Sequence, residues 1–284
     1  MTKYSYKSLE DYLQSHRLDV DGLLDDGWGA PFPVKGRLID VAILFCDLRS
    51  FSDRSKDLSP IETLILANNF FAWISAEGFK DRPCIVDKYI GDEIMVIFSE
   101  EFGSNDPVVD AADAARWIVE RDALAFCPRI GIDAGEVVIG YVGTPLKYDC
   151  SVYGTPVTIA QRCCQVKDAQ GSIVIPAKTW GSRKVEDVLT KGKIKTPDGE
   201  DFERPFLWSV TQPREVTFKH DSKIEIVELT QRSKLGGVVH LPSQSVEDRA
   251  RQGFELLKKE GSYHPSRYDF EAIPESLKKI FQKP

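Results

Sequence analysis

Two aspartates that follow apolar runs are the side chains best suited to chemistry in this sequence. Asp47 comes directly after the apolar residues 41–46, and Asp92 lies between two strand-like runs. The pair Gly91-Asp92 is typical of a tight β-hairpin turn, because glycine tolerates positive φ and aspartate bonds its own backbone. A turn residue is therefore the simple interpretation of Asp92 alone. Two carboxylates at the ends of buried strands together predict a site for a hard divalent cation.

Composition restricts the class of protein. The 284 residues are 42% hydrophobic and 29% charged, which is ordinary for a globular chain, and the formal net charge is −7. That charge argues against a general nucleic-acid binder, although a local cluster of cations with a metal can still bind a nucleotide. No apolar run is long enough to span a bilayer, and the first residues lack the apolar core of a signal peptide. We expect a cytoplasmic protein that contacts neither a membrane nor a nucleic acid.

Cysteine and histidine usage narrows the chemistry further. The six cysteines show no CxxC spacing, which indicates reduced and mostly buried thiols. The four histidines all lie outside the central region, which argues against a histidine-based catalytic centre.

The pattern of apolar residues predicts an α+β fold in which helices cover one sheet. The expected strands are 41–46, 84–88, 94–98, 129–133, 136–143, 149–153, 173–175 and 206–210, and the main expected helices are 60–77, 107–124 and 155–165. Residues 129–133 and 136–143 are predicted to form a strand pair joined by Ala134-Gly135. Three regions result: a helical lead-in over 1–38, a central domain over 39–212, and a charged appendage over 213–284 with one amphipathic helix near 246–259.

The helix after Asp47 has a recognisable start. Ser59, a proline at the next position and Glu62 form a capping box, so the helix should begin there. Its apolar positions predict that Leu64, Leu66 and Phe70 face the core.

Four segments in order resemble the class III nucleotidyl cyclases. They are 45–52 (Phe-Cys-Asp-Leu-Arg-Ser-Phe-Ser), 88–92 (Lys-Tyr-Ile-Gly-Asp), 129–135 (Arg-Ile-Gly-Ile-Asp-Ala-Gly) and 154–162 (Gly-Thr-Pro-Val-Thr-Ile-Ala-Gln-Arg). The resemblance covers residues 39 to about 210. It implies a ferredoxin-like βαββαβ core that forms a head-to-tail homodimer with active sites composed from both subunits.

The resemblance also implies a metal centre. In the family, a pair of aspartates at the positions of Asp47 and Asp92 holds two Mg²⁺ or Mn²⁺ ions per active site, with the backbone of Leu48 beside them. One ion lowers the pKa of the attacking ribose hydroxyl, and the other bridges the phosphates of the nucleoside triphosphate.

Further residues are assigned by the same resemblance. The backbone of Ser50, Phe51 and Ser52 corresponds to the phosphate cradle, where helix N-terminal amides bind anions. Arg129 corresponds to an arginine that contacts the outer phosphates. Arg162 corresponds to the arginine that stabilises the transition state, against the simpler interpretation of a solvated helix arginine.

The sequence departs from the family where substrate is selected. Thr158 stands where the family usually has an asparagine that orients the ribose, so it acts through water or another residue replaces it. Asp133 stands where a histidine is usual, and we interpret it as structural. Lys191 and Lys193 both lie near the place of a phosphate-binding lysine, and the sequence does not choose between them.

The base-reading positions correspond to Lys88 and Ser151. Lysine only donates, whereas serine donates or accepts, so the pair disfavours GTP, permits ATP and suits a pyrimidine in a narrowed pocket. With these positions, the chain looks like the pyrimidine cyclases of Pycsar anti-phage systems. This resemblance implies that UTP, or CTP, is converted to a 3′,5′-cyclic monophosphate that a separate effector protein reads. An adenylate cyclase and a catalytically inactive regulatory domain remain as alternatives.

Overall fold

A computed structural model describes residues 6–16 and 36–231, except 121, 123–125, 145, 170, 182–192, 196–200, 204–207 and 219–221. The elements follow the predicted alternation of strands and helices. They are α1 (Leu9–Ser15), β1 (Gly36–Asp47), α2 (Phe51–Ser55), α3 (Pro60–Ile74) continued by a π-helical turn (Ser75–Phe79), β2 (Cys84–Ile90), β3 (Glu93–Phe98), a 3₁₀ turn (Glu100–Phe102), α4 (Pro107–Glu120), β4 (Arg129–Thr144), β5 (Lys147–Tyr153), α5 (Thr155–Cys164), β6 (Ile173–Pro176), α6 (Ala177–Gly181), β7 (Lys193–Lys195), β8 (Asp201–Glu203), β9 (Trp208–Val210), β10 (Arg214–Thr217) and β11 (Lys223–Gln231).

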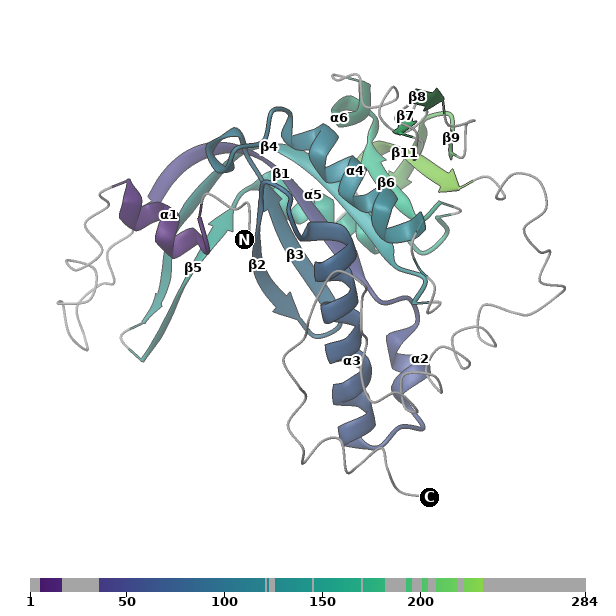
Figure 1. The fold of residues 1–284 in the computed structure, drawn as a ribbon, viewed down its shortest axis with the longest axis horizontal. Coiled ribbons are helices and arrows are strands. Elements are labelled where there is room, and N and C mark those ends of the chain that lie inside the picture. Colours follow the sequence, from purple (N-terminus) through teal and green to yellow (C-terminus); the bar gives the residue numbers. More distant parts are fainter. Residues whose placement is uncertain are drawn as a thin grey trace, which may run out of the picture.

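One mixed sheet forms the centre of the fold (Figure 1). Its strand order is β10-β11-β6-β4-β1-β3-β2, with β5 paired to β4 and β9 paired to β11, while β7 and β8 form a separate pair. The neighbours of β1 are both antiparallel to it, and β6 runs parallel to β4. The predicted α+β class with helices packed on a sheet is confirmed.

The predicted strand pair around Ala134-Gly135 is wrong. Residues 129–144 form the single strand β4, and Ala134 and Gly135 stay in register with Ala42 and Val41 of β1. A chain reversal would have broken this ladder, whose twelve residue pairs join the whole of β1 to β4. The true hairpin lies later, between β4 and β5.

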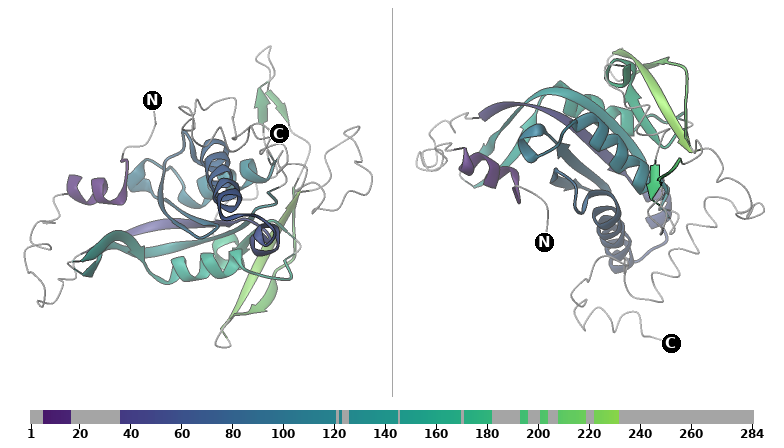
Figure 2. Two further views of the ribbon diagram at one scale, coloured as in Figure 1. Left: turned by 90° about the horizontal axis from the view of Figure 1, so that it is seen from below. Right: turned by 45° about the horizontal axis from the view of Figure 1, so that its top comes forward.

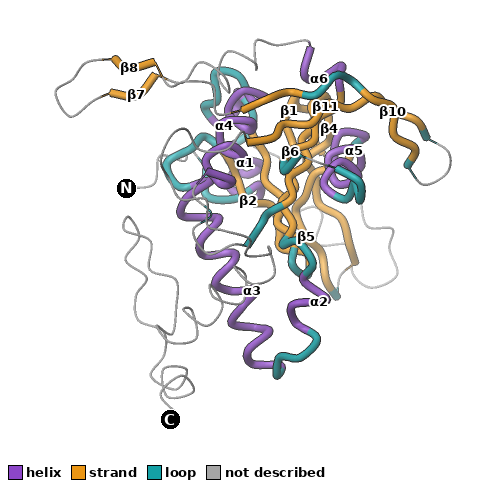
Figure 3. Tube along the Cα trace, turned by 90° about the vertical axis from the view of Figure 1, so that its right-hand side faces the viewer, coloured by secondary structure: helices purple, strands orange, loops and turns teal. Residues whose placement is uncertain are grey.

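Helices cover both faces of the sheet. Figure 2 and Figure 3 show α3 and α4 on one side of the central strands and α5 on the other. Successive side chains of β1 point to opposite faces of the sheet. Leu44 and Cys46 pack in the core under α3 and α4. Ile43 and Phe45 pack in a second core, which includes Ala160 and Cys164 of α5. Gly131 lets α5 approach β4 closely, since a Cβ there would overlap the carbonyl oxygen of Ala160.

The capping box of α3 is confirmed. Ser59 Oγ accepts a hydrogen bond from the Glu62 amide at 3.4 Å, and the Ser59 amide donates to Glu62 Oε2 at 2.9 Å. The inward position predicted for Leu64 is wrong, since this side chain is 61% exposed and Ile65 is buried instead. The helix presents Ile65, Leu66 and Phe70 to the core, which places Leu64 on its outer side.

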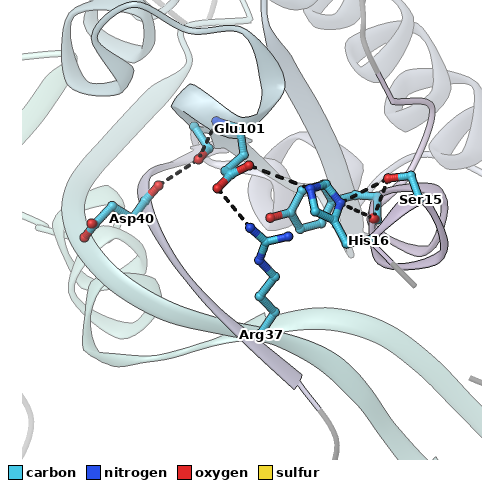
Figure 4. A network of polar contacts seen from close by, with 7 residues as sticks. Ser15, His16, Arg37, Asp40 and Glu101 are labelled. Carbon is cyan, nitrogen blue, oxygen red and sulfur yellow. Dashed lines mark hydrogen bonds and ion pairs between the residues drawn. The ribbon is translucent and has the colours of Figure 1, made fainter. Parts of the chain in front are cut away.

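The lead-in helix α1 is capped by Ser8, whose Oγ accepts from the Asp11 amide at 3.0 Å. A small polar network holds its C-terminal end beside the start of β1 (Figure 4). His16 Nε2 lies 3.9 Å from Glu101, and Arg37 Nη2 donates to the same carboxylate at 3.2 Å. The lead-in is thereby attached to the central sheet.

The sheet extends beyond residue 212, because β10 and β11 are hydrogen-bonded into it up to Gln231. The expected appendage helix near 246–259 lies outside the described residues. Within the part of the chain that the structure describes, no helix has the length and apolar character needed to cross a membrane.

Candidate active site

The two predicted carboxylates lie together at one end of the sheet. Asp47 ends β1, and Asp92 occupies the turn between β2 and β3 with Gly91 at a φ of +65°. The Leu48 amide donates to the carbonyl oxygen of Asp92 at 3.3 Å, which holds the end of β1 against the turn. The structure therefore brings together two side chains that are 45 positions apart in the sequence (92 minus 47).

Electrostatics couple these carboxylates. Burial, a hydrogen bond with Asp47 and the charge of Asp47 raise the pKa of Asp92 to about 7. Asp47 forms an ion pair with the guanidinium of Arg129, which lies opposite it in the β1–β4 register. Two acidic groups in contact favour sharing a proton unless a cation stabilises both charges.

The donor set fits a hard divalent cation. Asp47 and Asp92 supply carboxylate oxygens, which Mg²⁺ and Mn²⁺ prefer, and their contact is a like-charge pair that a cation would relieve. No group of three or more His, Cys, Asp or Glu residues suited to a metal is found among the described residues, so a bound cation would take its remaining ligands from the backbone, water or substrate.

Asp92 makes a pH-dependent contribution to stability in the metal-free protein. Its folded-state pKa of about 7 lies above its unfolded value, so the contribution is present at low pH and is lost as the pH rises through about 7. The charged groups that act on it are Asp47 and Glu93, and Arg129 pairs with Asp47. We expect the free energy of unfolding of the wild-type protein to fall more between about pH 4 and pH 7 than that of an Asp92→Asn variant, because the loss takes place between the ordinary pKa of 3.8 and the raised pKa of about 7. Urea unfolding in chelator measures both proteins, and identical pH profiles would contradict the assignment.

The expected phosphate cradle is a tight turn that leads into α2. Ser50 adopts a left-handed conformation with φ of +57°, and the Phe51 amide donates to the Leu48 carbonyl at 3.2 Å. Ser50 and Ser52 are exposed, while Phe51 is partly buried against the core. The turn therefore lies next to Asp47 with its serine side chains open to solvent.

The two expected base-reading residues share one partner that the sequence analysis did not single out. Ser151 is 1% exposed, and its Oγ donates to Asp87 Oδ2 at 2.8 Å. Lys88 Nζ lies 3.4 Å from the same oxygen. Burial raises the pKa of Asp87, although its bonds to Ser151 and Lys88 act in the opposite direction.

The predicted catalytic residues of α5 make no contact with the carboxylates among the described residues. Thr158 is exposed, and Arg162 Cζ lies 5.8 Å from the ring centroid of Phe218, beyond β10. Among the described residues, no contact joins Arg162 to Asp47 or Asp92. Within one chain, the structure therefore brings together the carboxylates and Arg129 but does not add Arg162.

Two further polar residues of the site were missed by the sequence analysis. Glu93 is buried beside Asp47, and its Oε2 accepts from Gln161 Nε2 of α5 at 3.0 Å. Burial raises the pKa of Glu93. The signal in the sequence was the position of Glu93 directly after Asp92 and that of Gln161 directly before Arg162.

Asp133 has the structural environment expected for it. It is buried, and its Oδ1 accepts from Thr179 Oγ1 at 2.6 Å. Lys191 lies outside the described residues, and nothing is described of the Lys193 side chain.

Comparison with known proteins identifies the family of the domain. The family described as "Adenylate and Guanylate cyclase catalytic domain" matches residues 34–196. An adenylate cyclase of Anabaena cylindrica is 31% identical over 134 residues, which are 43% of this chain and 26% of the relative. A terminal-differentiation-specific adenylate cyclase of Dictyostelium discoideum is 26% identical over 172 residues, or 54% of this chain and 8% of the relative.

Solved structures share the fold. The adenylyl cyclase CyaB from P. aeruginosa superposes with a TM-score of 0.53 at 20% identity, covering 71% of this chain and all of that chain. The guanylyl cyclase Cya2 gives the same TM-score and identity and covers 74% of this chain and 99% of its own.

The family match spans more than half of the chain, so this protein belongs to the adenylate and guanylate cyclase catalytic domain family. The chain spans 26% to 33% of the length of the first curated relatives.

Proposed function

We propose that this protein is a nucleotidyl cyclase that converts UTP, or CTP, to the 3′,5′-cyclic monophosphate and diphosphate. The observation that carries the cyclase assignment is the contact between Asp47 and Asp92 at the end of β1 and in the β2–β3 turn. Family membership supports the same reaction.

Each residue of the site would have a distinct role in cation or phosphate binding. Asp47 and Asp92 hold divalent cations, and when bound these supply charge stabilisation for the phosphates and acidify the ribose 3′-hydroxyl. Arg129 pairs with Asp47 in this structure, and its guanidinium would be available to bind the outer phosphates where that carboxylate held a cation. The turn at Ser50 and the start of α2 lie beside these groups and offer backbone amides to a phosphate oxygen.

Among the described residues Arg162 contacts neither carboxylate and lies against Phe218 instead, which supports a site composed from two subunits in a head-to-tail homodimer. The β4–β5 hairpin offers a surface for such a dimer, because it exposes large apolar side chains. These are Val138, Val142, Leu146, Tyr148 and Tyr153, with Leu146 80% exposed. In the proposed dimer, α5 of one chain brings Arg162 and Thr158 to the carboxylates of the other. Arg162 then stabilises charge on the transferring phosphate, and Thr158 faces the ribose, directly or through water.

A pyrimidine substrate is favoured by Ser151 and Lys88. Ser151 is buried and small, and its hydroxyl hydrogen is already bonded to Asp87. It therefore offers fewer hydrogen-bond acceptors to the edge of a purine than a free carboxylate would. We further propose that the cyclic product is a signal in the cytoplasm, that a separate effector protein reads it, and that its role is anti-phage defence. An adenylate cyclase is the second candidate, because Lys88 can donate to adenine N1 and two of the relatives are named adenylate cyclases.

The experiment that tests the substrate is incubation of purified protein with Mn²⁺ and each of ATP, GTP, CTP and UTP, followed by identification of the product by mass. We expect cyclic UMP, or cyclic CMP, to be the main product. Cyclic AMP as the only product would show that the protein is an adenylate cyclase. No cyclic product from any of the four would favour an inactive regulatory domain.

A further inference from the structure

Asp87 is the extra residue of a β-bulge on β2. Val86 pairs with Val96 of β3 and Lys88 pairs with Met95, so Asp87 has no residue opposite it. Bulges redirect a side chain and are frequent beside active sites. Here the side chain of Asp87 is only 1% exposed, although the neighbouring Lys88 side chain is 30% exposed.

The contact from Asp87 reaches across the sheet. Ser151 lies on β5 and Asp87 lies on β2, and the strand order between them is β5-β4-β1-β3-β2. These strands are separated by four strand-to-strand spacings, which in a flat sheet would span roughly 19 Å. The Ser151 hydroxyl nevertheless lies 2.8 Å from Asp87 Oδ2. Only a strongly curled sheet places β2 and β5 so close, so the bond joins two edges of one curved surface.

This bond fixes what Ser151 can offer to a ligand. A serine hydroxyl has one hydrogen, and an ionised carboxylate only accepts, so the hydrogen points to Asp87. The oxygen of Ser151 is left with acceptor capacity alone. Lys88 lies beside the same carboxylate and has donors alone.

The side-chain contacts of Asp87 among the described residues are confined to its Oδ2 atom. Oδ1 is buried and has no hydrogen-bond partner among the described residues. A buried carboxylate oxygen without a donor is costly, so the two donors on Oδ2, Ser151 and Lys88, are the groups that stabilise this carboxylate.

We propose that Asp87 sets the hydrogen-bonding polarity of the base pocket, as a positioning residue that holds Ser151 as an acceptor beside the donor Lys88. This inference rests on the proposed function, because it concerns the base position of the same site. The base must present an N–H donor next to an acceptor. Uracil does so with N3–H and O4, and cytosine does so with its N4 amino group and N3. Adenine (N6 amino group and N1) and guanine (N1–H and O6) present the same pair, so the width of the pocket must select between pyrimidine and purine.

The test measures binding and needs no turnover. The α,β-methylene analogues of UTP, CTP, ATP and GTP, which cannot lose diphosphate, are titrated by calorimetry into wild-type protein, Asp87→Ala, Ser151→Ala and the double variant. We expect Asp87→Ala to weaken binding of the preferred analogue by about tenfold and to reduce the differences among the four. The double variant should bind no more weakly than either single variant, because Asp87 acts through Ser151. Asp87→Asn should retain most of the affinity, since its amide oxygen still accepts from Ser151.

One control variant separates this role from a structural one. Asp149→Ala removes an exposed carboxylate two positions from Ser151 on the same strand, and it should leave the order of the four affinities unchanged. If Asp87→Ala lowers the melting temperature but keeps the wild-type order of affinities, or if the effects of the two single variants add, the inference is overturned while the proposed function stands. If the wild-type protein binds none of the analogues, both are overturned.

Discussion

Asparagine at position 47 or position 92 is expected to reduce cyclic nucleotide formation by about a thousandfold or more, because each change removes a charged ligand from the cation site. The two carboxylates contact each other and would bind the same cation site, so we expect both to be needed for cation binding. Product formation is measured by mass at saturating Mn²⁺ and nucleotide. The cooperative unfolding transition of each variant should remain, because asparagine has nearly the same shape as aspartate.

Asp40→Asn is the matched control for this prediction. Asp40 lies on β1 like Asp47, but it is exposed and seven positions away, towards the other end of the strand. The Ser99 hydroxyl bonds its backbone carbonyl and not its side chain, so this substitution leaves that contact intact. Activity close to wild type is expected for Asp40→Asn. Full activity in Asp47→Asn or Asp92→Asn would refute the metal site.

Mixing an Asp47→Ala protein with an Arg162→Ala protein should restore activity that neither has alone. A mixed dimer has one site with both defects and one site with neither, provided that the carboxylates come from one chain and Arg162 from the other. Random pairing of equal amounts makes half of the dimers mixed, so we expect about a quarter of the wild-type activity. Each variant alone should be inactive, because an arginine that stabilises transferring phosphate typically contributes about a thousandfold or more.

A mixture of Asp47→Ala with Asp92→Ala controls for nonspecific recovery. Both carboxylates of a site belong to one chain. In a mixed dimer, one site therefore lacks Asp47 and the other lacks Asp92. This mixture should stay inactive. Recovery there, or none with Arg162→Ala although mixed dimers are shown to form, would contradict the two-subunit arrangement.

Features determined by local chain chemistry could be predicted from the sequence. The hairpin that presents Asp92 follows from the Gly91-Asp92 turn, and the start of α3 follows from the Ser59 and Glu62 cap. The end of β1 at Asp47 follows from its long apolar run.

Features determined by pairing across the sheet could not be predicted. Ala134 and Gly135 look like a turn locally, but the ladder with β1 keeps them extended. The bond between Asp87 and Ser151 depends on a bulge and on the curl of the sheet, neither of which leaves a periodic signal. The pairing of Glu93 with Gln161 likewise arises only when α5 packs on the strands.

The most direct test of the central claim, that Asp47 and Asp92 form one cation site, is Mn²⁺ binding measured by electron paramagnetic resonance of the free ion. Mn²⁺ is titrated into wild-type protein, Asp47→Asn and Asp40→Asn in the presence of the α,β-methylene analogue of UTP. The account predicts that wild-type protein and Asp40→Asn withdraw Mn²⁺ beyond what the nucleotide binds by itself, and that Asp47→Asn does not. Equal Mn²⁺ binding by Asp47→Asn and wild-type protein would contradict it.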